Sequence, residues 1–169
     1  MVVEARDSES GEFDALVLSL SPSATDPDLR CACYRLKAWA HEIDDRSDVA
    51  RIYWDSLSAE PTGPGNPLLE IPNADRDRFR DAWVLARAGR IDPAAALLQE
   101  ELAPGGGNRH DTRYERAAAY AALGAVEPAV QELRHLLSVP SEVTTASLRD
   151  RIVWDPIRDH PSFRALLGG

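Results

Sequence analysis

The sequence predicts an all-α fold built from antiparallel helix pairs, and three observations lead to this prediction. One segment is followed by a second, similar segment 35 residues later, counted from Phe79 to Tyr114. Within both segments, apolar residues recur every three or four positions, which is the period of an amphipathic helix. Each segment also carries a glycine and a proline at matching places, which is typical of a helix end followed by a helix start.

The two segments align without a gap from Phe79 and from Tyr114 onward. At this shift Gly89 falls on Gly124, at the point where the first helical pattern stops. The other matches pair Ala82 with Ala117, Leu85 with Tyr120, Ile91 with Val126, Asp92 with Glu127, Pro93 with Pro128, Ala94 with Ala129 and Leu98 with Leu133. Because the matches cover two helical patterns and the turn between them, the repeating unit is a complete helix pair.

Each shared position has a structural role in such a pair. The glycine ends the first helix, because it accepts a left-handed backbone without steric cost. The acidic residue, Asp92 or Glu127, is expected to cap the second helix by accepting hydrogen bonds from its first N–H groups. The proline suits the first position of that helix, and the alanines let the two helices approach closely.

This unit resembles the tetratricopeptide repeat, a helix pair with a usual period of about 34 residues. The resemblance rests on a small residue in each helix, the turn glycine and the apolar residue that follows it. The chain departs from the family pattern in two places, because it lacks the tryptophan early in the first helix and because Pro104 opens a PGGGN stretch where a closing proline is expected. The resemblance implies a right-handed α-α superhelix that binds a protein or a peptide and performs no chemistry of its own.

A third copy lies upstream, at a shift of 44 residues, when Ala38 and Trp39 are placed on Ala82 and Trp83. Asp45 then takes the place of the turn glycine. The chain therefore contains about three helix pairs, and Pro and Gly in the stretch 61–67 predict a loop after the first pair.

The repeat domain is expected to span residues 28–169, with residues 1–27 as an N-terminal extension. In the extension, four apolar residues at helical spacing favour one short helix, and a strand is the alternative. They are Phe13, Leu16, Val17 and Leu20.

The last part of the chain is expected to close the array. Asp155 and Pro156 are expected to start one short turn, and His160 and Pro161 another. One face of the last helix carries three apolar residues, namely Phe163, Leu166 and Leu167. This ending resembles that of tetratricopeptide arrays in bacterial signalling and regulatory proteins, where a final helix covers the exposed apolar side of the solenoid.

The stretch DDRSD raises an alternative function, because Asp44, Asp45 and Asp48 have the spacing that holds magnesium in enzymes acting on diphosphates. Those enzymes place the motif on one long helix, facing a second acidic motif, and no convincing second motif is present here. A hard cation needs several converging oxygens. The repeat instead predicts Asp44 and Asp45 in the turn and Asp48 as the cap of the next helix.

The net charge and the apolar content of the chain argue against nucleic-acid binding and against a membrane protein. The chain has a formal net charge of −9 and a pI near 4.9, so nucleic-acid binding would need a segregated basic face, and none is expected. No run approaches the roughly 20 apolar residues of a membrane span, and no signal peptide is evident, which predicts a cytoplasmic protein without a membrane partner. The arginine-rich composition suggests a bacterial genome rich in G and C.

Neither a cofactor nor a metal is expected. The four histidines are scattered and show no zinc-binding spacing, with His110 read as a loop residue and His135 as an exposed helical one. Cys31 and Cys33 would point apart on a helix and are read as small apolar residues.

The tetratricopeptide resemblance places a ligand on the concave face formed by the first helices of successive repeats. Carried over to this chain, it selects Arg35, Trp39, Glu42, Arg76, Phe79, Trp83, Arg87 and Tyr114. Arginine and large aromatic residues dominate binding energy at interfaces, so the hypothesis is a groove for a protein or peptide that carries acidic residues. Two alternatives stay open: the aromatic rings pack between repeats, or the exposed repeat edge forms a homodimer.

Overall fold

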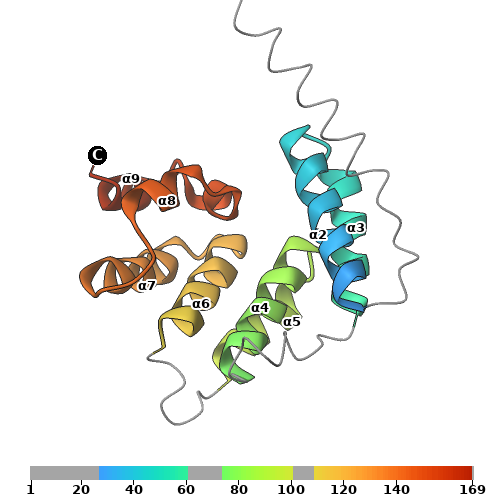
Figure 1. Ribbon diagram of the computed structural model, residues 1–169, viewed down its shortest axis with the longest axis horizontal. Helices are drawn as coiled ribbons and strands as arrows, with labels where there is room; N and C mark the ends of the chain where they lie inside the picture. Colours follow the sequence, from blue (N-terminus) through green and yellow to red (C-terminus); the bar gives the residue numbers. More distant parts are fainter. Residues whose placement is uncertain (1–26, 61–73, 101–108, 169) are drawn as a thin grey trace, which may run out of the picture. The chain divides into compact units, whose positions relative to one another are not determined.

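The computed structural model describes residues 27–60, 74–100 and 109–168, and every regular element in these ranges is helical (Figure 1). This confirms the predicted all-α class. The chain divides into two compact units, Met1–Gly63 and Pro64–Gly169, and each is described by itself. None of the described helices is both long and apolar enough to cross a membrane.

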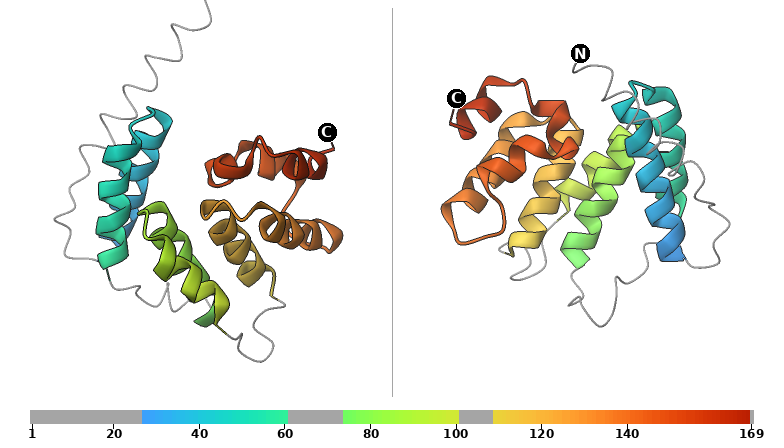
Figure 2. Two further views of the ribbon diagram at one scale, coloured as in Figure 1. Left: turned by 180° about the vertical axis from the view of Figure 1, so that it is seen from behind. Right: turned by 45° about the horizontal axis from the view of Figure 1, so that its top comes forward.

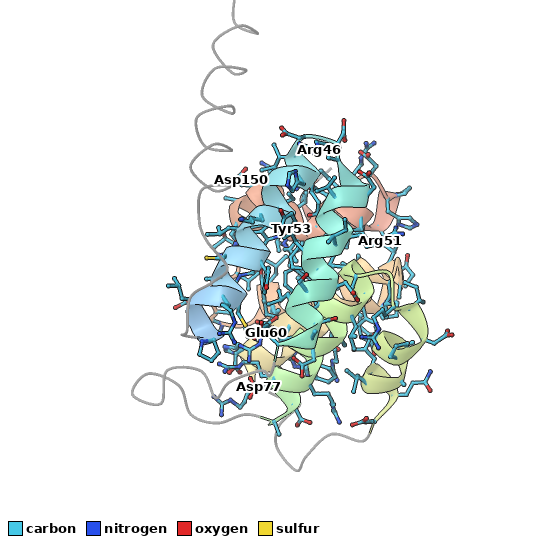
Figure 3. The ribbon with its side chains drawn as sticks, turned by 90° about the vertical axis from the view of Figure 1, so that its right-hand side faces the viewer. Arg46, Arg51, Tyr53, Glu60, Asp77 and Asp150 are labelled. Atoms are coloured by element: carbon cyan, nitrogen blue, oxygen red, sulfur yellow. The ribbon has the colours of Figure 1, made fainter. Side chains whose placement is uncertain are left out.

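The N-terminal unit contains one helix pair, α2 (Pro27–Ile43) and α3 (Ser47–Ala59). The two helices lie side by side, with Arg46 at the turn between them and Glu60 at the opposite end (Figure 3). At that end the Arg30 guanidinium forms a two-pronged ion pair with the Glu60 carboxylate, at 2.8 and 3.1 Å. The hairpin is thus joined both by its turn and by an ion pair at its open end.

Aromatic packing fills the space between α2 and α3. The Trp54 side chain is buried, and its indole Nε1 donates a hydrogen bond of 2.7 Å to the Glu42 carboxylate. The Trp39 ring meets the Trp54 ring edge to face, with 6.3 Å between the ring centroids. Two apolar side chains near the ends of α2, Leu29 and Ile43, are exposed.

The C-terminal unit contains two further helix pairs and a closing segment. The pairs are α4 (Ala74–Arg87) with α5 (Ile91–Gln99), and α6 (His110–Ala122) with α7 (Val126–Ser138). The first helices, α4 and α6, pack side by side (Figure 2). The alanines that the alignment pairs are fully buried, namely Ala82, Ala94, Ala117 and Ala129, which confirms that small residues occupy the helix contacts.

The three turns share one backbone geometry. Gly89 and Gly124 have φ angles of 80° and 71°, and Asp45 has φ of 56°, the only positive value among the described residues other than glycine. In each turn, the N–H of the residue after this position bonds to the carbonyl five residues earlier, at 2.8 to 2.9 Å. These are the bonds of a Schellman helix ending. The turns therefore lie where the alignment predicted them, and the upstream segment forms a helix pair.

The predicted capping role of the acidic residues is wrong. Asp48, Asp92 and Glu127 lie in the first turns of α3, α5 and α7, and the cap residues before these helices accept no side-chain hydrogen bond. The reason is that one residue closes the first helix and starts the second; Arg90, for example, donates its N–H to Leu85 and accepts from Ala94 through its carbonyl. These three acidic side chains instead place a negative charge near the positive end of each helix dipole, which is favourable. Pro93 and Pro128 occupy the third position of their helices rather than the predicted first position.

The closing segment differs in part from its prediction. It consists of α8 (Thr145–Asp150), which the sequence analysis did not predict, the 3₁₀-helix η2 (Ile152–Ile157) and α9 (Pro161–Leu166). Asp155 and Pro156 lie inside η2 rather than at its start, whereas His160 and Pro161 do begin α9, as predicted.

The closing segment covers the last helix pair. The 3₁₀-helix η2 packs against α6 and the helix α9 packs against α7, which buries Trp154 and Phe163 completely. Leu166 and Leu167 are half-buried beside them. The predicted short helix near residues 13–20 and the predicted loop at 61–67 lie outside the described residues.

Candidate functional site

Three of the eight residues proposed for the groove belong to the N-terminal unit. Glu42 accepts the hydrogen bond from Trp54, so its carboxylate supports the packing of the hairpin. Trp39 is half-buried against the same tryptophan. Arg35 is exposed, and its guanidinium carbon lies 5.7 Å from the centroid of the Trp39 ring, at cation–π distance. Of these three residues, only Arg35 presents a largely exposed side chain.

The other five residues belong to the C-terminal unit, and two of them are in its core. Phe79 is 1% exposed and Trp83 is 7% exposed. The guanidinium carbons of Arg78 and Arg116 lie 4.9 and 5.6 Å from the centroid of the Phe79 ring. Both rings are therefore packed inside the repeats rather than displayed on a surface. Arg87 is half-buried in the last turn of α4.

The structure brings the remaining two, Arg76 and Tyr114, together in one cleft of about 910 Å³. This volume is in the range of protein pockets that bind small ligands. The cleft is lined by the first turn of α4, the start of α6, the connection between α7 and α8, and the end of α8. Its lining residues are Arg76, Arg109, His110, Asp111, Tyr114, Glu115, Pro140, Ser141, Glu142, Val143, Ser147 and Arg151.

Hydrogen bonds within the chain hold the α7–α8 connection in place as one wall of the cleft. The Ser141 hydroxyl donates to the Leu136 carbonyl at 2.8 Å and accepts from the Val143 N–H at 3.3 Å. At the start of α8, Thr144 and Ser147 form a reciprocal capping box, in which each side chain accepts the other residue's N–H. The wall is thus fixed before any ligand binds.

Two of the three arginines in the cleft meet the same carboxylate. The Arg109 guanidinium donates to both carboxylate oxygens of Asp111, each at 3.3 Å. A nitrogen of Arg76 lies 4.0 Å from an Asp111 oxygen, and Arg76 also donates to Asp77 at 3.3 Å. Asp111 therefore neutralises part of the positive charge that enters the cleft from α4 and from the start of α6.

The third arginine, Arg151, is bonded differently. Its guanidinium donates a hydrogen bond of 2.9 Å to the Tyr114 hydroxyl, and its carbon lies 5.6 Å from the centroid of the Tyr114 ring. Among the described residues, Arg151 forms no ion pair with a carboxylate. An arginine has five N–H donors, so most of this fork remains available to an incoming anion.

Tyr114 connects this arginine to the core of the closing segment. Its ring meets the buried Trp154 ring edge to face, with 5.5 Å between centroids. Burial raises the pKa of the Tyr114 phenol, although the hydrogen bond from Arg151 acts in the opposite direction. The Arg151 carbonyl also accepts a 2.9 Å hydrogen bond from Arg158, which fixes the backbone that carries the guanidinium. Arg151 is therefore an exposed side chain on a rigid support.

Sequence reasoning missed most of this cleft. His110 was read as a loop residue, which is wrong, because it begins α6. Arg109, Glu142 and Arg151 were not proposed, because the resemblance supplies candidates only from the first helices of the repeats. The Thr144-to-Ser147 spacing resembles a capping box and could have indicated α8. His135 is exposed on α7, as predicted.

The DDRSD stretch lies elsewhere, at the turn of the N-terminal hairpin. Asp44 and Asp45 are exposed in the turn, and Asp48 is exposed in the first turn of α3. Within residues 27–60, 74–100 and 109–168, no group of three or more His, Cys, Asp or Glu side chains is placed to hold a metal ion. The site that the described residues do build is the cleft beside Arg151.

Searches against protein-family models, curated proteins and solved structures return no match to this chain.

Proposed function

We propose that the chain is a tetratricopeptide-like interaction module, without catalysis of its own, that binds a segment of a partner protein in the cleft between α6 and the α7–α8 connection. The repeated helix pairs supply the rigid support, and the cleft supplies the binding groups. In this proposal the principal anchor is Arg151, which receives a carboxylate of the partner. Arg76 and Tyr114, which were selected from the resemblance, also line this cleft.

The single observation that supports this proposal is the exposure and hydrogen bonding of the Arg151 side chain. Its backbone is fixed, its side chain is exposed, and its guanidinium bonds to a phenol rather than to a carboxylate. A charge-assisted, two-pronged bond from arginine to a carboxylate is among the strongest polar contacts at interfaces. The Tyr114 ring beside it offers the flat apolar contact that commonly surrounds such an anchor.

The test is a comparison of charge reversals at two exposed arginines. Arg151→Glu removes the anchor, whereas Arg134→Glu makes the same change on α7 at a residue outside the cleft. The tagged full chain and both variants are used to capture partners from a bacterial lysate, and circular dichroism checks their folding. Loss of a specific partner with Arg151→Glu, together with its retention by Arg134→Glu, supports the proposal. Equal capture by all three proteins contradicts it.

A further inference from the structure

The cleft contains two exposed side chains of opposite charge, Arg151 and Glu142. Arg151 has no ion pair among the described residues, and neither does Glu142, which is exposed on the α7–α8 connection. Two other arginines of the lining, Arg76 and Arg109, both approach the Asp111 carboxylate. A ligand therefore meets, within the same cleft, a guanidinium and a carboxylate that form no ion pair with a described residue.

The charges of the whole lining also balance. Arg76, Arg109 and Arg151 contribute three positive charges, and Asp111, Glu115 and Glu142 contribute three negative ones. The chain as a whole has a net charge of −9, so a strongly acidic segment would be repelled as it approached. A strongly basic segment would be attracted from a distance but would meet three arginines in the cleft. Neither kind of segment matches the lining.

We infer that the cleft selects a partner segment of mixed charge, with an acidic side chain bound by Arg151 and a basic side chain bound by Glu142. This inference rests on the proposed function and narrows the class of partner. Arg151 supplies a fork that fits a carboxylate, and Glu142 accepts hydrogen bonds from lysine or arginine. Discrimination comes from repulsion, because a segment with only one sign of charge places a like charge beside one of the two groups.

The test uses fluorescein-labelled peptides of one length, each acetylated and amidated so that the termini carry no charge. Every peptide has the same central tyrosine. One peptide has two glutamates and two arginines, a second has four glutamates, and a third has four arginines. Fluorescence anisotropy with the full chain at low salt measures each dissociation constant. The mixed-charge peptide should bind at least about tenfold more tightly than either of the others, an effect of the size that like-charge contacts produce.

Two charge reversals separate this inference from the proposed function. Arg151→Glu should weaken binding of the mixed-charge peptide about tenfold, as should Glu142→Arg, and Glu142→Arg should in addition strengthen binding of the four-glutamate peptide. Arg134→Glu serves as the control outside the cleft. Circular dichroism should give the same spectrum for all variants, because the substituted side chains are exposed.

The inference is overturned if the four-glutamate peptide binds wild type as tightly as the mixed-charge peptide, if Glu142→Arg leaves the preference unchanged, or if the mixed-charge peptide shows no saturable binding. These results would not contradict Arg151 as the anchor for a natural partner, because the capture experiment tests that role separately. Unchanged partner capture by Arg151→Glu instead overturns the proposed function itself.

Discussion

The helix pairs α4–α5 and α6–α7 have the same turn and aligned sequences, yet their second helices are buried to different extents. Helix α7 contributes Ala129, Val130, Leu133 and Leu136 to the core, whereas the described part of α5 contributes only Ala94. The difference comes from what packs against each helix, because α9 covers α7 and the first helix α6 packs mainly on α4. The repeated residues therefore determine the hairpin, and the segment that packs against its second helix determines how much of that helix is buried.

The largest expected effect comes from the equivalent leucines of the two second helices. Leu133 is fully buried, so Leu133→Ala should reduce the free energy of unfolding by about 2–5 kcal/mol through lost apolar burial and a remaining cavity. Leu98 is half-buried, and Leu98→Ala should cost about 1 kcal/mol. Urea unfolding of both variants measures the difference. Equal losses would mean that α5 is covered as completely as α7.

The second comparison concerns the ion pairs between the first helix of each hairpin and an acidic residue, which is Glu132 within α7 or Glu100 directly after α5. Glu132 receives hydrogen bonds of 2.7 and 2.5 Å from Arg113 and Arg116, and its side chain is 12% exposed. Glu132→Ala should cost about 2 kcal/mol, because it leaves two largely buried guanidinium groups without this carboxylate. Glu100, which pairs with Arg78, is 56% exposed, and Glu100→Ala should cost about 0.5 kcal/mol or less.

The same urea experiment checks this pair of variants, and Glu132→Gln provides the conservative control. The amide keeps the size of the side chain and one acceptor, so it should recover part of the lost stability. If Glu100→Ala proves as damaging as Glu132→Ala, exposure does not explain the difference between the two hairpins.

Local signals in the sequence predicted the hairpins well, for reasons visible in the structure. Gly89 and Gly124 mark the turns because the backbone there has positive φ, and the paired alanines mark the helix contacts because they are fully buried. The prediction of acidic caps failed because Arg90 both ends α4 and begins α5. The general preference for acidic residues at helix starts does not anticipate a cap residue that is shared by two helices. The cleft was only partly predictable. Tyr114 and Arg151 are 37 residues apart, and their contact depends on how the closing segment packs.

The third prediction concerns the turns, where substitutions in two hairpins should change the free energy of unfolding in opposite directions. A Cβ added at Gly124 would meet no atom within 4 Å, so Gly124→Ala tests only the cost of the left-handed backbone, about 1 kcal/mol. At Asp45 the same backbone is already occupied by a residue with a Cβ, so Asp45→Gly should be neutral or stabilising by about 0.5 kcal/mol. Thermal unfolding measures both. A destabilised Asp45→Gly would show that the Asp45 side chain itself supports the turn.

The smallest expected effect is a pH dependence that differs in sign between the two units. The hydrogen bond from Arg30 lowers the pKa of the Glu60 carboxyl below its ordinary value of 4.5. The stabilisation from Glu60 is therefore complete above the ordinary pKa and is lost as the pH falls through the lower, folded value. In the C-terminal unit, burial raises the pKa of Asp81 above 3.8, with Arg80 opposing this shift. Asp81 therefore contributes stability in acid that is lost as the pH rises through that range.

Urea unfolding between neutral pH and about pH 3 measures both effects. The free energy of unfolding of wild type should exceed that of Glu60→Gln by less as the pH falls. The free energy of unfolding of Asp81→Asn, relative to wild type, should increase from acid toward neutral pH. Parallel pH profiles for wild type and both variants would mean that neither carboxyl changes its proton affinity on folding.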